Sequence, residues 1–291
     1  MTTRVYGTPH YEKLAATLHS DKLPPDDHPR MQHAIERYRQ WIADLRAATA
    51  ADIPPDVTLA RMIHLLNEYR LFIDLELIFD SPHDFLYRQK GQLKLDNSVI
   101  EEFLPWLIHP TLLPEVPLDE ITIGPVKAFA AVYFESSLDV PARGGGLQIR
   151  TKDQDFAISK PLFLKASHSR NFADATTLLQ PTNLAYVVAE CKTNLDKTMF
   201  QEAVATAHDV KLAVLGAKYF LLCEWLDMTP ISTAPTDIDE VIILRQAKRL
   251  SASVRKNFDK ATQRQAYRGQ YQDFLLQHPL RLAMFQRFVD H

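Results

Sequence analysis

The chain has 291 residues, 46% of them hydrophobic, and a formal net charge of −3 at pH 7. Its length and composition allow a substantial core in one large domain or two. The slightly negative charge argues against a basic protein that simply coats nucleic acid, but it permits an enzyme that gathers its Lys and Arg on one face. With no run of about 18 apolar residues and no signal-peptide pattern at the start, we expect a cytoplasmic protein without a membrane partner.

The two cysteines, Cys191 and Cys223, lie within apolar runs, where free thiols behave as small hydrophobes. Neither a disulfide framework nor the short, fixed ligand spacing of a zinc site occurs in the sequence.

Helical periodicity dominates the N-terminal part of the chain. Apolar residues recur every three to four positions in 33–45 and 57–79, which predicts two helices separated by Pro54-Pro55. The capping pair Asp96-Asn97 predicts a third helix over 98–108. We also expect a helix over 125–136, and we assign residues 1–124 to a helical N-terminal region.

The pattern changes to strands after three consecutive glycines at 144–146. Short apolar runs predict an antiparallel meander, followed by a helix over 196–215 and strands at 219–222 and 241–244; the meander strands are predicted at 147–150, at 156–158 with 162–164, and at 184–191. This order predicts an α/β fold with an αβββαβ core over 125–246 and a helical tail over 247–291.

The tail is rich in basic residues, which are Lys248, Arg249, Arg255, Lys256, Lys260, Arg264 and Arg268. Two interpretations remain open: a surface that meets phosphates, or the solvated face of a helix.

The run at 184–191 ends in a carboxylate and an ammonium, Glu190 and Lys192. Side chains two positions apart in a strand point to the same face, so this pair projects together from the strand end. Such a carboxylate can hold a divalent cation while the lysine steadies an attacking water or developing phosphoryl charge. The alternative is a surface ion pair worth at most about 1 kcal/mol. A second hit, Asp209-Val210-Lys211, lies in a predicted helix, where such residues do not face each other.

Phosphodiester hydrolysis with Mg²⁺ would need a second carboxylate near Glu190. Magnesium prefers hard oxygen ligands, and the backbone carbonyl of Cys191 is a natural third one. Asp155 opens an apolar strand that could return beside Glu190, whereas Asp174 would lie opposite it if the chain turned at 180–183. We favour Asp155 because the run that follows it is the more apolar.

Three segments resemble the BbvCI-like restriction endonucleases of the PD-(D/E)xK superfamily. Residues 189–203 (AECKTNLDKTMFQEA) resemble the catalytic segment, and the other two are 84–97 (DFLYRQKGQLKLDN) and 152–158 (KDQDFAI). In one departure from the motif, no Pro precedes either Asp155 or Asp174.

The resemblance implies a heterodimer of two related subunits that recognises an asymmetric site in double-stranded DNA, each subunit cutting one strand with Mg²⁺. It implies that Glu190 is a metal ligand and Lys192 the water-positioning or charge-stabilising group, with Asp155 or Asp174 as second ligand. Gln201 and Lys197 would face the site from the start of the next helix. The helical region and residues 88–94 would be candidates for base or phosphate contacts.

The resulting hypothesis is a Mg²⁺-dependent, sequence-specific endonuclease subunit of a type II restriction system. One alternative is a nuclease of the same fold that recognises DNA structure in repair or recombination. Another is a non-catalytic DNA-binding partner subunit in which Glu190 and Lys192 form only a surface pair.

Overall fold

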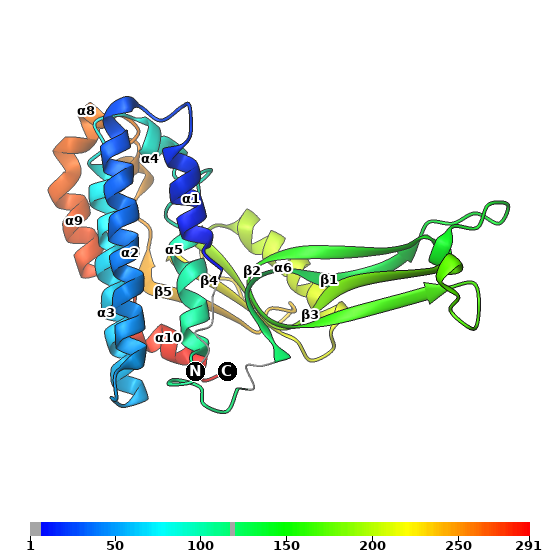
Figure 1. The fold of residues 1–291 in the computed structure, drawn as a ribbon. Coiled ribbons are helices and arrows are strands. Elements are labelled where there is room, and N and C mark those ends of the chain that lie inside the picture. Colours follow the sequence, from blue (N-terminus) through cyan, green and yellow to red (C-terminus); the bar gives the residue numbers. More distant parts are fainter. Residues whose placement is uncertain (1–6, 117–119) are drawn as a thin grey trace.

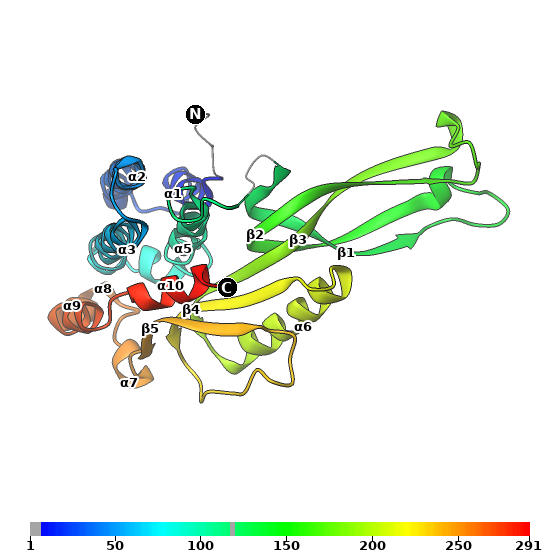
Figure 2. The same cartoon turned by 90° about the horizontal axis from the view of Figure 1, so that it is seen from below.

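A bundle of helices covers one face of a five-stranded sheet and a single helix covers the other (Figures 1 and 2). The computed structural model describes residues 7–116 and 120–291, so residues 1–6 and 117–119 of the predicted N-terminal region lie outside the described part. The bundle begins with α1 (Pro9–Leu18), α2 (His28–Ala50), α3 (Pro55–Phe72), α4 (Phe85–Gln89) and α5 (Ser98–Phe103).

The helices predicted in the N-terminal region are confirmed. Helix α2 contains 33–45, and α3 runs into a π-helical turn, Ile73–Phe79, so that the two together cover 57–79. Helix α5 continues as a 3-10 helix, Leu104–Ile108, and ends one residue before His109-Pro110. None of the described helices is long and apolar enough to cross a membrane.

The sheet confirms the predicted α/β fold and its αβββαβ order, but the helix that precedes the first three strands is α5 and not residues 125–136. Its strands lie in the order β1-β2-β3-β4-β5; they are β1 (Thr122–Phe134), β2 (Leu147–Ser167), β3 (Thr177–Leu195), β4 (Lys218–Leu226) and β5 (Glu240–Lys248). The first three are antiparallel neighbours, whereas β3, β4 and β5 run parallel. Helix α6 (Lys197–Ala213) connects β3 to β4.

Two element predictions are wrong. Residues 125–136 do not form a helix, because most of them lie in β1, which pairs with β2 along its length. Apolar residues crowd this segment so closely that they fit a helical period as well as a strand period, and only pairing with β2 decides between them. The segments at 147–150 and 156–164 belong to one strand, β2, rather than two.

Strand β2 changes direction in its middle, so that both of its ends reach the same end of a projecting arm (Figure 1). Gly144, just before β2, lies so close to the far half of the hairpin that a Cβ there would meet the Leu178 Cβ at 2.4 Å and the Ala166 oxygen at 2.9 Å. Ala128 of β1 also pairs with Asn183 of β3. The arm therefore consists of paired segments of β1, β2 and β3, and the same three strands continue into the base of the sheet.

Alternation along the strands assigns each face of the sheet to a different layer. Ala189 and Cys191 of β3 and Phe220 and Leu222 of β4 pack against the helical bundle. Val188, Leu221 and Cys223 pack against α6. Both cysteines are free and buried, as predicted. The division into 1–124, 125–246 and 247–291 stays a prediction, because the bundle, the sheet and the last helix share one apolar cluster.

The basic tail has two different surroundings. It comprises α7 (Ala252–Arg255), α8 (Ala261–Arg264), α9 (Arg268–Gln277) and α10 (Leu282–Val289). Arg264 is fully buried and donates to the backbone carbonyls of Phe79, Ser81 and His83, while Arg268 pairs with Asp80. These arginines attach the tail to the bundle, whereas Arg249, Arg255 and Lys256 line a cleft.

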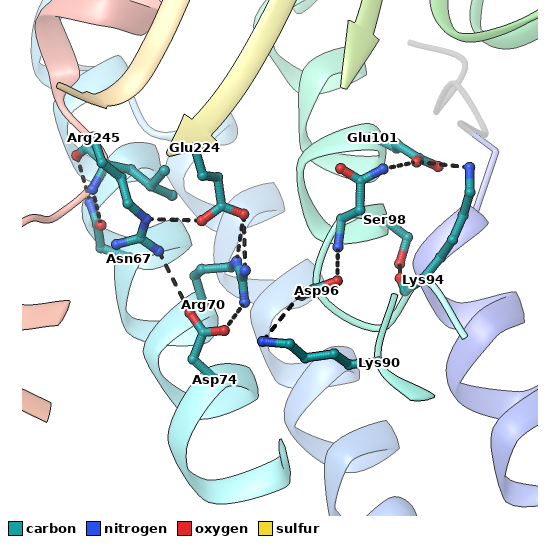
Figure 3. A network of polar contacts seen from close by, with 12 residues as sticks. Asn67, Arg70, Asp74, Lys90, Lys94, Asp96, Ser98, Glu101, Glu224 and Arg245 are labelled. Carbon is teal, nitrogen blue, oxygen red and sulfur yellow. Dashed lines mark hydrogen bonds and ion pairs between the residues drawn. The ribbon is translucent and has the colours of Figure 1, made fainter. Parts of the chain in front are cut away.

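A buried ion network joins the bundle to the sheet (Figure 3). Glu224 of β4 accepts from Arg70 of α3 at 3.0 Å and from Arg245 of β5 at 2.9 Å. Asp74 pairs with Arg70 at 2.6 Å and with Arg245 at 3.7 Å, and all four side chains are at most 4% exposed. The network fixes the bundle against the part of the sheet that carries the cleft.

Candidate active site

The register between β2 and β3 brings Asp155 to the strand end that carries Glu190 and Lys192. Phe156 lies opposite Ala189 in the antiparallel ladder. Asp155 Oδ2 accepts a hydrogen bond from the Cys191 backbone N–H at 2.9 Å. The preferred one of the two predicted aspartates is therefore next to the strand end.

Glu190 is held from two sides. The Lys192 ammonium lies 2.7 Å from Glu190 Oε1, and the Tyr219 hydroxyl donates to Glu190 Oε2. Burial opposes the charged form of Lys192, but the neighbouring carboxylates, Glu190 foremost, together outweigh burial and raise the lysine pKa. Burial and the charge of Glu190 also raise the pKa of Tyr219. Lys192 thus stays an ammonium and Tyr219 a hydroxyl donor.

The strand end lies in a cleft of about 740 Å³ between the bundle and the tail. Asp155, Glu190, Cys191 and Lys192 are among the residues that line it. Basic residues come from both sides: Arg88, Lys90 and Lys94 from the bundle, and Arg249, Arg255 and Lys256 from the tail. Cations around two carboxylates are an arrangement suited to a polyanion bound over a metal site.

Three further residues, Lys94, Asn97 and Glu101, are functional candidates beside the strand end. None of them was assigned to the catalytic site from the sequence. The Lys94 ammonium lies 3.4 Å from Glu101 Oε1 (Figure 3). The same ammonium lies 3.5 Å from Asp155 Oδ1. Asn97 Nδ2 donates to the same Glu101 oxygen at 2.7 Å. Burial and the charge of Asp155 raise the pKa of Glu101 to about 7. One signal was available: Glu101 and Glu102 interrupt an otherwise apolar helix, where carboxylates must be buried and partnered.

The predicted position of Asp174 beside Glu190 is wrong. Asp174 begins a 3-10 turn, Asp174–Thr176, which joins β2 to β3 beyond the pair Ser167 and Thr177. The turn expected at 180–183 is instead part of β3, with Gln180 opposite Leu164. Because the hairpin is longer than expected, Asp174 lies at the far end of the arm.

Helix α6 contributes different cleft residues from those predicted. Asp196 caps the helix by accepting from the Met199 backbone N–H at 2.9 Å. Met199 and Thr206 line the cleft, whereas Gln201 is exposed and neither it nor Lys197 is among the lining residues. Positions 199 and 206 are two helical turns apart on one face, and Gln201 points away from that face.

The donor set fits a hard divalent cation. Asp155 and Glu190 provide carboxylate oxygens, and the backbone of Cys191 adjoins both. Within 7–116 and 120–291, no group of three or more His, Cys, Asp and Glu side chains could hold a metal ion. Two carboxylates and one backbone carbonyl are a sufficient protein ligand set for a hard cation that keeps several waters.

Known proteins resemble this chain in sequence and in fold. Residues 92–291 match the family described as Bpu10I restriction endonuclease. A solved structure, the native BbvCI A2B2 tetramer at low resolution, superposes with a TM-score of 0.57 and 17% sequence identity over 94% of this chain and 99% of that one. No curated protein sequence matches the chain. Because the family match covers more than half of its length, the chain belongs to the Bpu10I restriction endonuclease family and is a type II site-specific nuclease.

Proposed function

We propose that this chain is a Mg²⁺-dependent subunit of a type II restriction endonuclease that cuts one strand of duplex DNA at a specific sequence. The observation that carries the proposal is the juxtaposition of Asp155 and Glu190 by the β2–β3 register, with Lys192 paired to Glu190 at 2.7 Å. A surface ion pair would need neither a second carboxylate nor a cleft lined by cations.

Asp155, Glu190 and the carbonyl of Cys191 would hold the cation. Bound there, it would polarise the phosphoryl oxygens and make water a better nucleophile at neutral pH. Lys192, kept charged by Glu190, supplies a positive charge at the same strand end, where it can orient the attacking water and stabilise the charge that develops on the phosphate. Tyr219 fixes the second oxygen of Glu190 and so keeps that carboxylate oriented.

The cleft walls are suited to the DNA backbone. Arg249 and Arg255 both pair with Asp227, at 3.1 and 3.2 Å, which orients the two guanidinium groups before DNA binds. Lys256 is exposed on the same wall. We assign the phosphate contacts of the tail to these three residues and not to Arg264 or Arg268, which bind the bundle.

A second, related subunit is part of the proposal. The solved neighbour is an A2B2 tetramer, and this chain covers 99% of the matched chain in it. We therefore expect the purified single chain to nick DNA or to cut it poorly, with efficient double-strand cleavage only when its partner is added.

The test is incubation of plasmid DNA with Mg²⁺ and the chain, with and without the product of the neighbouring gene, followed by sequencing of the ends. Glu190→Gln and Lys192→Met should abolish cutting by this chain but leave DNA binding, measured by gel shift. The matched control is Lys211→Met, which alters the other acid-x-Lys triplet. Lys211 pairs with Asp239 at 2.7 Å and is not among the residues that line the cleft.

Each outcome has a distinct meaning. Discrete ends at one sequence support the proposal, while cleavage without discrete fragments supports a structure-specific nuclease. Normal cutting by Lys192→Met in Mg²⁺ would refute the assigned site. Binding without any cleavage, with or without the partner, would instead identify a non-catalytic subunit.

A further inference from the structure

One oxygen of Asp155 is committed within the protein, and the other faces a lysine. Oδ2 accepts from the Cys191 backbone N–H at 2.9 Å, so Oδ1 is the freer of the two oxygens for a metal ligand bond. That atom lies 3.5 Å from the Lys94 ammonium, which is also 3.4 Å from Glu101 Oε1. An ammonium therefore holds the place next to Oδ1 that a cation would need.

The lysine is better able to leave this position than either carboxylate. Its side chain is 45% exposed, against 20% for Asp155 and 5% for Glu101. Its distances to both acids are also longer than the 2.7 Å between Lys192 and Glu190. Lys94 lines the cleft, so a displaced ammonium would enter the space proposed for the DNA backbone.

The backbone at Lys94 has an unusual conformation. Its φ of 51° is in the left-handed region, which non-glycine residues seldom adopt. The turn is closed by its own hydrogen bonds, from the Leu95 N–H to the Lys90 carbonyl at 3.1 Å and from the Ser98 N–H to the Lys94 carbonyl at 3.2 Å. The fold thus accepts local strain at a residue that contacts both carboxylates.

We infer that Lys94 is a positioning residue that neutralises Asp155 and Glu101 in the metal-free enzyme and is displaced from Asp155 Oδ1 by the divalent cation. This inference rests on the proposed function, since it requires Asp155 to be a metal ligand. Ammonium and metal then compete for one oxygen, so metal binding releases a positive charge into the DNA cleft. Bound DNA, which attracts the displaced ammonium, strengthens metal binding. By linkage, bound metal strengthens DNA binding by the same factor.

The test is a titration of the DNA-free chain with Mn²⁺, in which the electron paramagnetic resonance signal measures the free ion. Lys94→Met should bind Mn²⁺ about tenfold or more tightly than the native chain, because a competing like charge beside the ligand oxygen is gone. Lys94→Arg should keep the weaker, native affinity. Lys256→Met removes the same charge from the opposite wall, so its smaller change measures the long-range effect of charge alone.

The outcomes separate this inference from the proposed function. If Asp155→Asn removes the Mn²⁺ site but Lys94→Met leaves the affinity unchanged or lowers it, Lys94 has only a structural role and the inference fails alone. If the native chain binds no Mn²⁺, or if Asp155→Asn binds it as tightly as the native chain does, the metal site itself is wrong and both fail. As a check on folding, Mn²⁺ should raise the melting temperature of Lys94→Met by more than that of the native chain.

Discussion

Asp155 and Asp174 carry the same carboxylate, and the fold gives the two different surroundings. Asp155 contacts the backbone of Cys191 at the strand end, while Asp174 lies in the turn at the far end of the arm. We expect Asp155→Asn to lower the cleavage rate by at least about a hundredfold, since even the loss of a group behind a metal ligand costs about 10- to 100-fold. Asp174→Asn should cut like the native chain. Equal losses in the two variants, measured as initial nicking rates in Mg²⁺, would contradict the assignment.

Glu102, which is not among the residues that line the cleft, should make the stability of the protein depend on pH. It accepts from the backbone N–H groups of His10 and Tyr11 and from the Tyr38 hydroxyl, and burial raises its pKa to about 7. The unfolded chain ionises this group near its ordinary pKa of 4.5, so stability is full below that pH and is lost as pH rises through 7.

We expect the free energy of unfolding to fall between pH 4.5 and 7.5 by about 1–3 kcal/mol more in the native chain than in Glu102→Gln. Urea denaturation of the metal-free protein at several pH values measures this difference. Parallel pH profiles for the two proteins would show that Glu102 ionises as easily in the folded state as in water.

At the scale of elements, α6 depends on its cap as well as on its apolar face. Phe200, Ala203, Ala207 and Val210 pack it against the sheet, and the Asp196 side chain satisfies the Met199 N–H at its start. Asp196→Ala should lower the free energy of unfolding by about 1 kcal/mol, the usual cost of an N-cap. Asp196→Ser, which can accept the same hydrogen bond, should recover most of that loss in urea denaturation. A full loss in the serine variant would mean that the charge, and not the cap, is what matters.

The strand misread as a helix at 125–136 shows where element prediction stops. The period of apolar residues correctly indicated α2, α3 and α6, because each has a buried stripe and a defined break at its end. The pair Asp96-Asn97 indicated the start of α5, whose residues are all buried. In β1, Ala128 and Ala130 are buried at strand spacing, but their neighbours Phe129 and Ala131 are partly buried as well. Residues 128–134 (AFAAVYF) are all apolar, so the sequence of this part of β1 has no clear period.

At the scale of the whole molecule, Glu224 and Asp227 can be compared, because each carboxylate pairs with two arginines. Glu224 is 1% exposed between Arg70 and Arg245, and these arginines lower its pKa against the effect of burial. Asp227 is 32% exposed between Arg249 and Arg255. Glu224→Gln should lower the free energy of unfolding by about 3–5 kcal/mol, because it leaves buried charges uncompensated.

For Asp227→Asn the loss should be about 0–1 kcal/mol, as for other exposed pairs. Because Glu224 joins the bundle to the sheet, its loss should shift a single cooperative unfolding transition monitored by circular dichroism. Separate transitions for helices and strands in that variant would show that the bundle and the sheet fold independently.

The sequence alone determined the strand end with Glu190 and Lys192, the helices α2, α3 and α5 of the bundle, and helix α6 with strands on either side of it, because these follow from local spacing, periodicity and capping residues. Only the tertiary structure decided which aspartate joins Glu190, that Lys94 and Glu101 lie beside it, and which basic residues of the tail reach the cleft. These contacts join residues distant in the chain, such as Asp155 and Cys191 or Arg264 and Phe79. The physical reason is the register and length of the β2–β3 hairpin and the docking of the tail, neither of which has a local signature.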